Sequence, residues 1–166
     1  MSKSVVIAVD AMGGDNSPTK VIAGISEYIK KNKNVFFRIF GKKILIIKEI
    51  SKYQISSNLF EIIDCDDVVE NNDTPLSAAK KKNTSMWQAI NDVNVKKSNV
   101  VVSAGNTGAL FVIAKLNLKM IENIDKPALS GLWPSKKGMS VVLDLGANID
   151  CSDKNLIDFA IMGSSL

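Results

Sequence analysis

The chain has 166 residues, of which 46% are hydrophobic and 23% are charged, and its formal net charge is +4. This length and apolar fraction predict one globular domain and exclude a disordered chain. Histidine is absent and cysteine occurs only at Cys65 and Cys151. Catalytic Ser-His or Cys-His pairs, histidine metal ligands and a disulfide framework are therefore excluded, and a reducing compartment is favoured. No secretory or membrane-spanning segment is found, so we expect a cytoplasmic protein.

Short apolar segments alternate with helical patterns along the chain. Strands are predicted at residues 5–10, 35–40, 59–64, 99–103 and 140–145. Most of them are continuously apolar, which is typical of strands buried on both faces of a parallel sheet. Helices are predicted at residues 18–31, 42–53, 84–93, 107–121 and 153–162. The alternation predicts an α/β protein with three layers and a mostly parallel, Rossmann-like sheet.

Two of these helices carry further signals. Ser17 is a candidate N-cap for the first helix, with Pro18 at its first position. The helix at 107–121 is apolar nearly all round, which predicts an internal helix. The sequence reaches Leu166 while an apolar helix is still running. We therefore expect a truncated chain, half of a larger unit.

Three polar loops follow predicted strands, where parallel α/β sheets bind their ligands. The first, residues 10–18, contains Gly13 and Gly14, which let main-chain amides approach an anion, and a helix N-terminus follows it. Asp10 and Asp15 are candidates for accepting a proton. The alternative is a tight turn in which Asn16 or Ser17 caps the helix.

The second loop, residues 103–108, joins the fourth strand to the apolar helix. Its hydroxyl and amide groups and its small residues predict a phosphate cradle at a helix N-terminus. It lacks the lysine of a P-loop, so nucleotide hydrolysis is not implied. The alternative is a closely packed, capped turn. The residues concerned are Ser103, Gly105, Asn106, Thr107 and Gly108.

The third loop, residues 144–151, follows the fifth predicted strand. A carboxylate and an amide beside the other two loops would complete one shared pocket, whereas the alternative is an ordinary turn. Cys151 is expected to be an inert thiol, because nothing in the sequence around it would lower its pKa. The residues concerned are Asp144, Gly146, Asn148 and Asp150.

Charged segments outside these loops give weaker signals. The acidic run at residues 64–73 is interpreted as a solvated loop, since its spacing matches no EF-hand, and no metal site is predicted. The lysine groups are interpreted as solvated faces, with weak attraction to an acidic partner as the alternative. Nucleic acid is not favoured as a partner, because no aromatic residues interleave with the lysines.

Taken together, the motifs resemble a known family. VDAMGGDNSP, NDTPLSAAKKKNTSM, VVSAGNTGAL, KPAL and LDLGANIDC occur in that order and are similar to motifs of the bacterial phosphate acyltransferases of phospholipid synthesis. The resemblance covers residues 5–162, about the first half of a typical member. Residues 1–166 are therefore interpreted as the N-terminal part of a single α/β phosphate acyltransferase domain.

The resemblance implies a reaction and its partners. Members transfer a long acyl group from acyl carrier protein to inorganic phosphate, which yields acyl phosphate and needs no cofactor. Their fold is similar to that of isocitrate dehydrogenases and phosphate acetyltransferases. They are homodimers loosely associated with the membrane, and we expect a homodimer only of a full-length form. The second half would supply the membrane-facing helices, more of the sheet and the remainder of the site.

The resemblance also suggests roles for residues. It implies catalytic roles for Asp10, Asp15 and Asn106. Phosphate or acyl phosphate would be bound by Gly13, Gly14, Asn16, Ser103, Gly105, Thr107, Gly108, Asp144, Gly146, Asn148 and Asp150.

The sequence departs from the family at one motif. Asn83 stands where the family commonly has aspartate, and neighbouring lysines replace the family's arginines. A lysine cannot form the paired hydrogen bonds that an arginine guanidinium makes with a carboxylate, so the ion pairs of the family are not expected in this segment. Without the second half, we expect the chain alone to be an inactive fragment. Two other functions stay open, a non-catalytic module that binds an anion or carrier protein, and an enzyme that uses acyl-coenzyme A.

Overall fold

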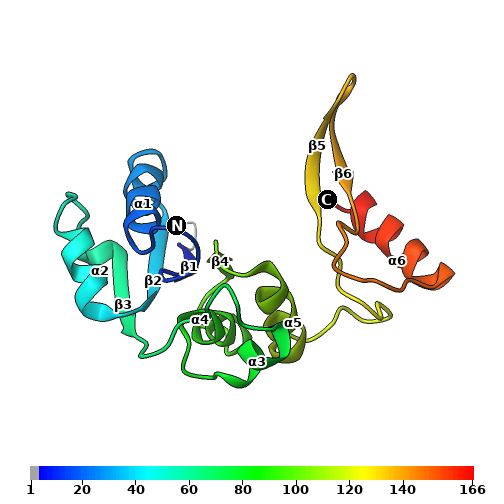
Figure 1. Ribbon diagram of the computed structural model, residues 1–166. Helices are drawn as coiled ribbons and strands as arrows, with labels where there is room; N and C mark the ends of the chain where they lie inside the picture. The colour runs from blue at the N-terminus through cyan, green and yellow to red at the C-terminus, as the bar shows by residue number, and fades with distance from the viewer. Residues whose placement is uncertain (1–3) are drawn as a thin grey trace. The chain divides into compact units, whose positions relative to one another are not determined.

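Four apolar segments form one parallel sheet in a computed structural model that describes residues 4–166 (Figure 1). Its strands are β1 (Val5–Asp10), β2 (Val35–Gly41), β3 (Phe60–Asp64) and β4 (Val100–Ser103). The sheet has the order β3-β2-β1-β4, and all three strand pairs are parallel. Four of the five predicted strands are thus confirmed, with small shifts of their ends.

Helices cover both faces of this sheet. The side chains of Val9, Phe37 and Ile39 pack on one face with residues of α1 (Thr19–Lys31) and α2 (Lys43–Ile50). Ala8 and Phe40 point to the other face and pack with Ala89 of α4 (Ser85–Asn94). Successive strand residues face opposite sides, so these apolar runs bury both faces. The predicted three-layer, Rossmann-like α/β fold is confirmed.

A third cluster lies among helices beyond the sheet. Ala78, Ile90 and Ile113 are buried there, and they join α3 (Pro75–Lys80), α4 and α5 (Thr107–Asn117). A short 3₁₀ turn, Ser57–Leu59, precedes β3. Helix α3 is not among the predicted helices, although Thr74 caps it and a proline stands at its start. At six residues it is too short to show a hydrophobic period.

The single arginine links the sheet to a helix. Arg38 of β2 donates from Nε to the Asp92 carboxylate of α4 at 2.8 Å, and its other end pairs with Glu61 of β3. The Asp92 carboxylate also accepts the Ser98 hydroxyl at 2.6 Å. Asp92 is buried, so its carboxylate has lost its hydration, and the hydrogen bonds from Arg38 and Ser98 replace those to water.

The chain divides into two units, with the boundary in the sequence between Leu118 and Lys119. The second unit contains β5 (Gly131–Ser135), β6 (Gly138–Val142) and α6 (Asp153–Ser164). β6 pairs antiparallel with β5 in a separate two-stranded sheet. The strand predicted at 140–145 is thus found in part, as β6, but its place in the parallel sheet was wrong. An apolar run shows that a segment is extended but does not identify its partner strand.

Three local expectations also need correction. The β4 residues Val100 and Val102 are exposed on one face, so this edge strand is not buried on both. Helix α5 ends at Asn117, and only Ala109 and Ile113 are buried in it, so it is not internal. Ser17 does not cap α1, because its hydroxyl donates to the Gly13 carbonyl and Pro18 occupies the cap position. Within residues 4–166, no helix is both long and apolar enough to cross a bilayer.

Candidate functional site

The Asp10 carboxylate joins three elements at the carboxyl edge of the sheet. Asp10 ends β1 and is only 2% exposed. One of its oxygens accepts the Ser85 hydroxyl at 2.6 Å and the Met12 amide at 3.2 Å, and the other accepts the Ser103 hydroxyl at 2.7 Å. Ser85 begins α4, whereas Ser103 ends β4. The buried charge is therefore stabilised by hydroxyl and amide donors, and it fixes the first two predicted loops to each other.

The glycines of these two loops are in direct contact. A Cβ atom on Gly13 would lie 2.6 Å from the Asp10 carboxylate and 2.8 Å from the Gly105 nitrogen. A Cβ on Gly14 would lie 2.5 Å from the Ala104 carbonyl oxygen, and Gly14 also has a φ of +86°, which favours glycine. The structure thus brings the loops at 10–18 and 103–108 together, with glycine required at the contact.

Asp15 and Asn16 lie at the outer part of the first loop. Both side chains are exposed. Asn16 has a φ of +60°, the left-handed conformation that asparagine tolerates better than most residues. It therefore turns the chain ahead of α1.

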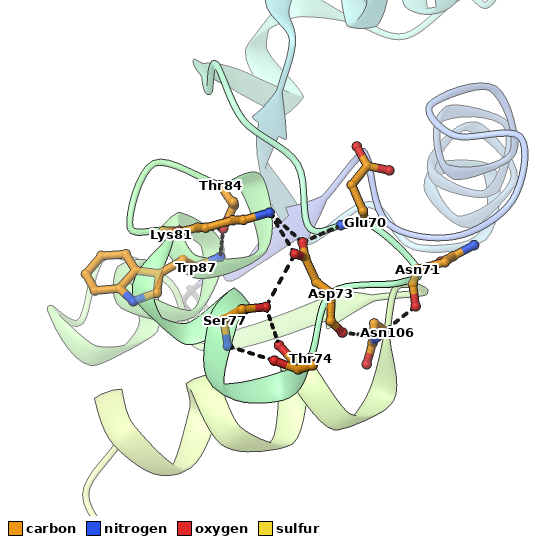
Figure 2. A network of polar contacts seen from close by, with 9 residues as sticks. All are labelled: Glu70, Asn71, Asp73, Thr74, Ser77, Lys81, Thr84, Trp87 and Asn106. Atoms are coloured by element: carbon orange, nitrogen blue, oxygen red, sulfur yellow. Dashed lines mark hydrogen bonds and ion pairs between the residues drawn. The ribbon is translucent and has the colours of Figure 1, made fainter.

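Asn106 ties the second loop to the acidic run (Figure 2). Its side-chain oxygen accepts the Ala109 amide at 3.0 Å and so caps α5. Its side-chain nitrogen donates to the carbonyls of Asn71 and Asp73 at 3.4 and 3.3 Å. Thr107 follows as an exposed residue at the start of α5, and Gly108 lets Pro75 approach, since a Cβ there would lie 3.0 Å from the proline Cγ. Asn106 thus holds the acidic run against the start of α5, and its predicted catalytic role stays a prediction.

The Asp73 network lies within the run that was interpreted as a solvated loop. Asp66, Asp67 and Glu70 are exposed, as that interpretation requires. The Asp73 side chain is only 13% exposed, and its oxygens accept the Lys81 ammonium at 2.7 and 2.8 Å (Figure 2). The hydrogen bond from Lys81 is the main cause that lowers the pKa of Asp73, with help from the Glu70 amide. Asp73 thus orders the segment that Asn106 holds.

Capping residues define the helices on either side of this network. Thr74 accepts the Ser77 amide at 3.2 Å, and Thr84 accepts the Trp87 amide at 3.3 Å (Figure 2). A threonine ahead of each short helix was the sequence signal that could have revealed this arrangement. Among residues 4–166, no group of three or more acidic or cysteine side chains is placed to hold a metal ion.

A cavity of about 500 Å³ adjoins the two loops. Asp10, Ser103 and Ala104 line one part of it, and the rest is mostly apolar, with Ile7, Val21, Ile25, Phe37 and Val102 in its wall. It lies between α1 and the β1–β4 side of the sheet. Lys20, in the first turn of α1, contributes a positive charge to the wall. Neither Lys20 nor Ser85 is among the predicted site residues, because neither lies in a glycine-rich loop.

The third predicted loop belongs to the second unit. The Asp144 carboxylate accepts the amides of Leu129 and Asn148 at 2.8 and 2.7 Å, and the Asn148 side chain at 2.9 Å. Burial acts to raise the pKa of Asp144, but these hydrogen bonds outweigh it and leave the pKa below its ordinary value. Gly146 has a φ of +80°, and the Asp150 carbonyl accepts Lys126. The place of this loop in a shared pocket stays a prediction.

Comparison with known proteins supports the family resemblance. Residues 5–166 match the family described as "Fatty acid synthesis protein". The chain is 66% identical to a phosphate acyltransferase of Pelagibacter ubique over all of its length and 50% of the relative's. It is 47% identical to that of Neorickettsia sennetsu and 42% identical to that of Clostridium acetobutylicum, covering 49% and 48% of those chains and 99% and 96% of its own. The chain thus spans about half the length of these curated relatives, and it belongs to the fatty acid synthesis protein family.

Proposed function

We propose that this chain carries the phosphate- and acyl-binding part of a phosphate acyltransferase. The reaction would move a long acyl group from acyl carrier protein to inorganic phosphate. One observation carries the proposal, namely that two glycine loops locked together by Asp10 adjoin a mostly apolar cavity. An anion site beside an apolar cavity suits a phosphate and an acyl chain that must meet.

Three features support phosphate binding at the joined loops. The α5 N-terminus lies at the second loop and adds its partial positive charge. Thr107, the first residue of α5, is exposed there. Lys20 supplies a full positive charge to the same cavity. The roles proposed for Gly13 and Gly14 are contributions of backbone, whereas the Gly105 amide already donates to the Ser103 hydroxyl at 3.1 Å.

The cavity supports an acyl chain as the second substrate. Its volume of about 500 Å³ lies in the range of roughly 300–1,000 Å³ that is usual for small-molecule sites. Its aliphatic and aromatic wall favours a long hydrocarbon chain over an acetyl group, because burial of apolar surface would drive binding. This favours a long-chain acyl donor over acetyl-coenzyme A.

The chemistry needs no nucleophile from the protein. A phosphate oxygen attacks the thioester carbonyl carbon, the new C–O bond forms, the C–S bond breaks, and the thiolate of the carrier takes the proton lost by phosphate. Amides and Lys20 would stabilise the charge that develops on oxygen. Asp10 already accepts three hydrogen bonds, whereas no polar contact occupies the exposed Asp15 side chain within residues 4–166. We therefore assign proton relay to Asp15 and positioning to Asp10.

The test is phosphate-dependent release of free carrier-protein thiol from acyl carrier protein. Because the chain spans half of its relatives, we expect turnover when the second half of the Pelagibacter ubique relative is added, and little without it. Lys20→Gln should raise the phosphate KM, whereas Lys31→Gln, at the other end of α1, should not. The proposed function would be refuted if thiol release did not depend on phosphate, with or without the added second half. It would also be refuted if release required acyl-coenzyme A as the donor.

A further inference from the structure

The outer face of α2 is apolar and exposed. Ile44 is 83% exposed, Ile47 48% and Leu45 41%. The opposite face holds Ile46, which is fully buried in the core between α2 and the sheet. Residues three and four apart are neighbours on a helix, so Ile44, Ile47 and Lys48 form one surface. Neighbouring large aliphatic side chains on a protein surface indicate an interaction site.

This face is also strongly basic. Lys42, Lys43 and Lys48 are exposed, and residues 42–48 include no acidic residue. The one carboxylate of the helix, Glu49, is buried on the other side and accepts Lys52 at 2.7 and 2.8 Å. The Asp64 carboxylate accepts the main-chain amide of Lys43 at 2.9 Å, but within residues 4–166 the lysine side chains of this face form no ion pair. They are therefore available to an external acidic group. We name Lys43, Ile44, Ile47 and Lys48 the α2 patch.

The α2 patch begins at the same edge of the sheet as the joined loops. Helix α2 follows β2 directly, beside α1 and β3 (Figure 1). The Phe40 carbonyl accepts the Ala11 amide at 2.9 Å, and a Cβ on Gly41 would lie 2.7 Å from the Met12 side chain. The end of β2, two residues before α2 begins, thus packs against the first loop. A partner docked there could present a tethered group to the cavity.

We propose that the α2 patch docks an acidic carrier protein, the acyl donor, through its lysines and its two isoleucines. The inference rests on the proposed function, which makes an acyl carrier protein the donor. Opposite charges would steer the encounter and fix its register, and the isoleucines would form the desolvated centre. A second copy of this chain is a poorer occupant, because its α2 patch would place lysines against lysines, and like charges repel. The helix has eight residues and no aromatic side chain, unlike helices that insert into lipid.

The test measures binding of acyl carrier protein to the full chain by fluorescence anisotropy, without phosphate. The charge reversal Lys43→Glu with Lys48→Glu should weaken affinity about tenfold or more, because each substitution replaces attraction by repulsion. The matched control, Lys31→Glu with Lys33→Glu, changes the net charge by the same amount. These residues lie near the amino end of β2, at the opposite edge of the sheet from α2, so the affinity should be unchanged. Ile44→Ser with Ile47→Ser should weaken binding while retaining its salt dependence.

The outcomes separate this inference from the proposed function. Equal affinities for the two charge-reversal variants, or no binding by the unaltered chain, would overturn it. So would loss of dimerisation in the Ile44→Ser with Ile47→Ser variant, or binding to anionic vesicles in place of carrier protein. Binding that depends on the α2 patch but yields no phosphate-dependent turnover would retain the docking surface and refute the proposed reaction. Circular dichroism melts check that each variant is folded.

Discussion

Substitution of Gly13 by alanine tests the contact between the two loops. The new methyl group would lie 2.6 Å from the Asp10 carboxylate, 2.8 Å from the Gly105 nitrogen and 2.9 Å from the Ser103 hydroxyl. These neighbours are backbone or hydrogen-bonded groups, so the loops must separate. Overpacking costs about 1–3 kcal/mol, and loss of one hydrogen bond adds about 1 kcal/mol. We expect Gly13→Ala to lower the free energy of unfolding of the first unit by about 2–4 kcal/mol.

Gly24→Ala provides the matched control. Gly24 lies within α1, and a Cβ there meets nothing within 4 Å. The same substitution should therefore stabilise the chain by about 0.5–1 kcal/mol, because alanine favours the helix.

The assay is urea unfolding followed by Trp87 fluorescence. The only other tryptophan, Trp133, is 58% exposed in the second unit, and phenylalanine can replace it to leave Trp87 as the single reporter. An unchanged unfolding free energy for Gly13→Ala would refute the reasoning, as would equal effects of the two alanines.

Two further predictions concern ionisable groups. The pKa of Asp73 is lower in the folded chain than its ordinary value of 3.8. Its ionised carboxylate therefore stabilises the fold at pH values above 3.8, and this stabilisation is lost as the pH falls through the pKa of the folded state. Asp73→Asn should therefore flatten the acid side of a stability–pH profile, and an unchanged slope would contradict this. Burial raises the pKa of Cys65 to about 11, so at about pH 8 a thiol reagent should label exposed Cys151 rapidly and Cys65 only after unfolding. Rapid labelling of both in the native chain would contradict the burial.

At the candidate site, the sequence predicts the glycine loops but not the hydrogen-bond partners of Asp10. The glycine loops were found because strand ends in a parallel sheet share one edge, and the structure brings two of them together. Asp10 is a candidate for proton transfer by sequence. In the folded chain its carboxylate accepts three hydrogen bonds, and the sequence does not show these donors. Ser85 comes from α4, 75 residues away from Asp10 in the sequence, and no local pattern relates the two.

Continuous apolar runs and helical periods are local properties of the chain, and they were enough to predict four parallel strands and the helices that cover them. They could not predict that β6 pairs with β5, because the hydrogen-bond partners of a strand depend on the whole fold. They also could not predict that Asn106 caps α5 and holds the segment at 71–73. A polar side chain in a loop has several possible partners, and packing selects among them.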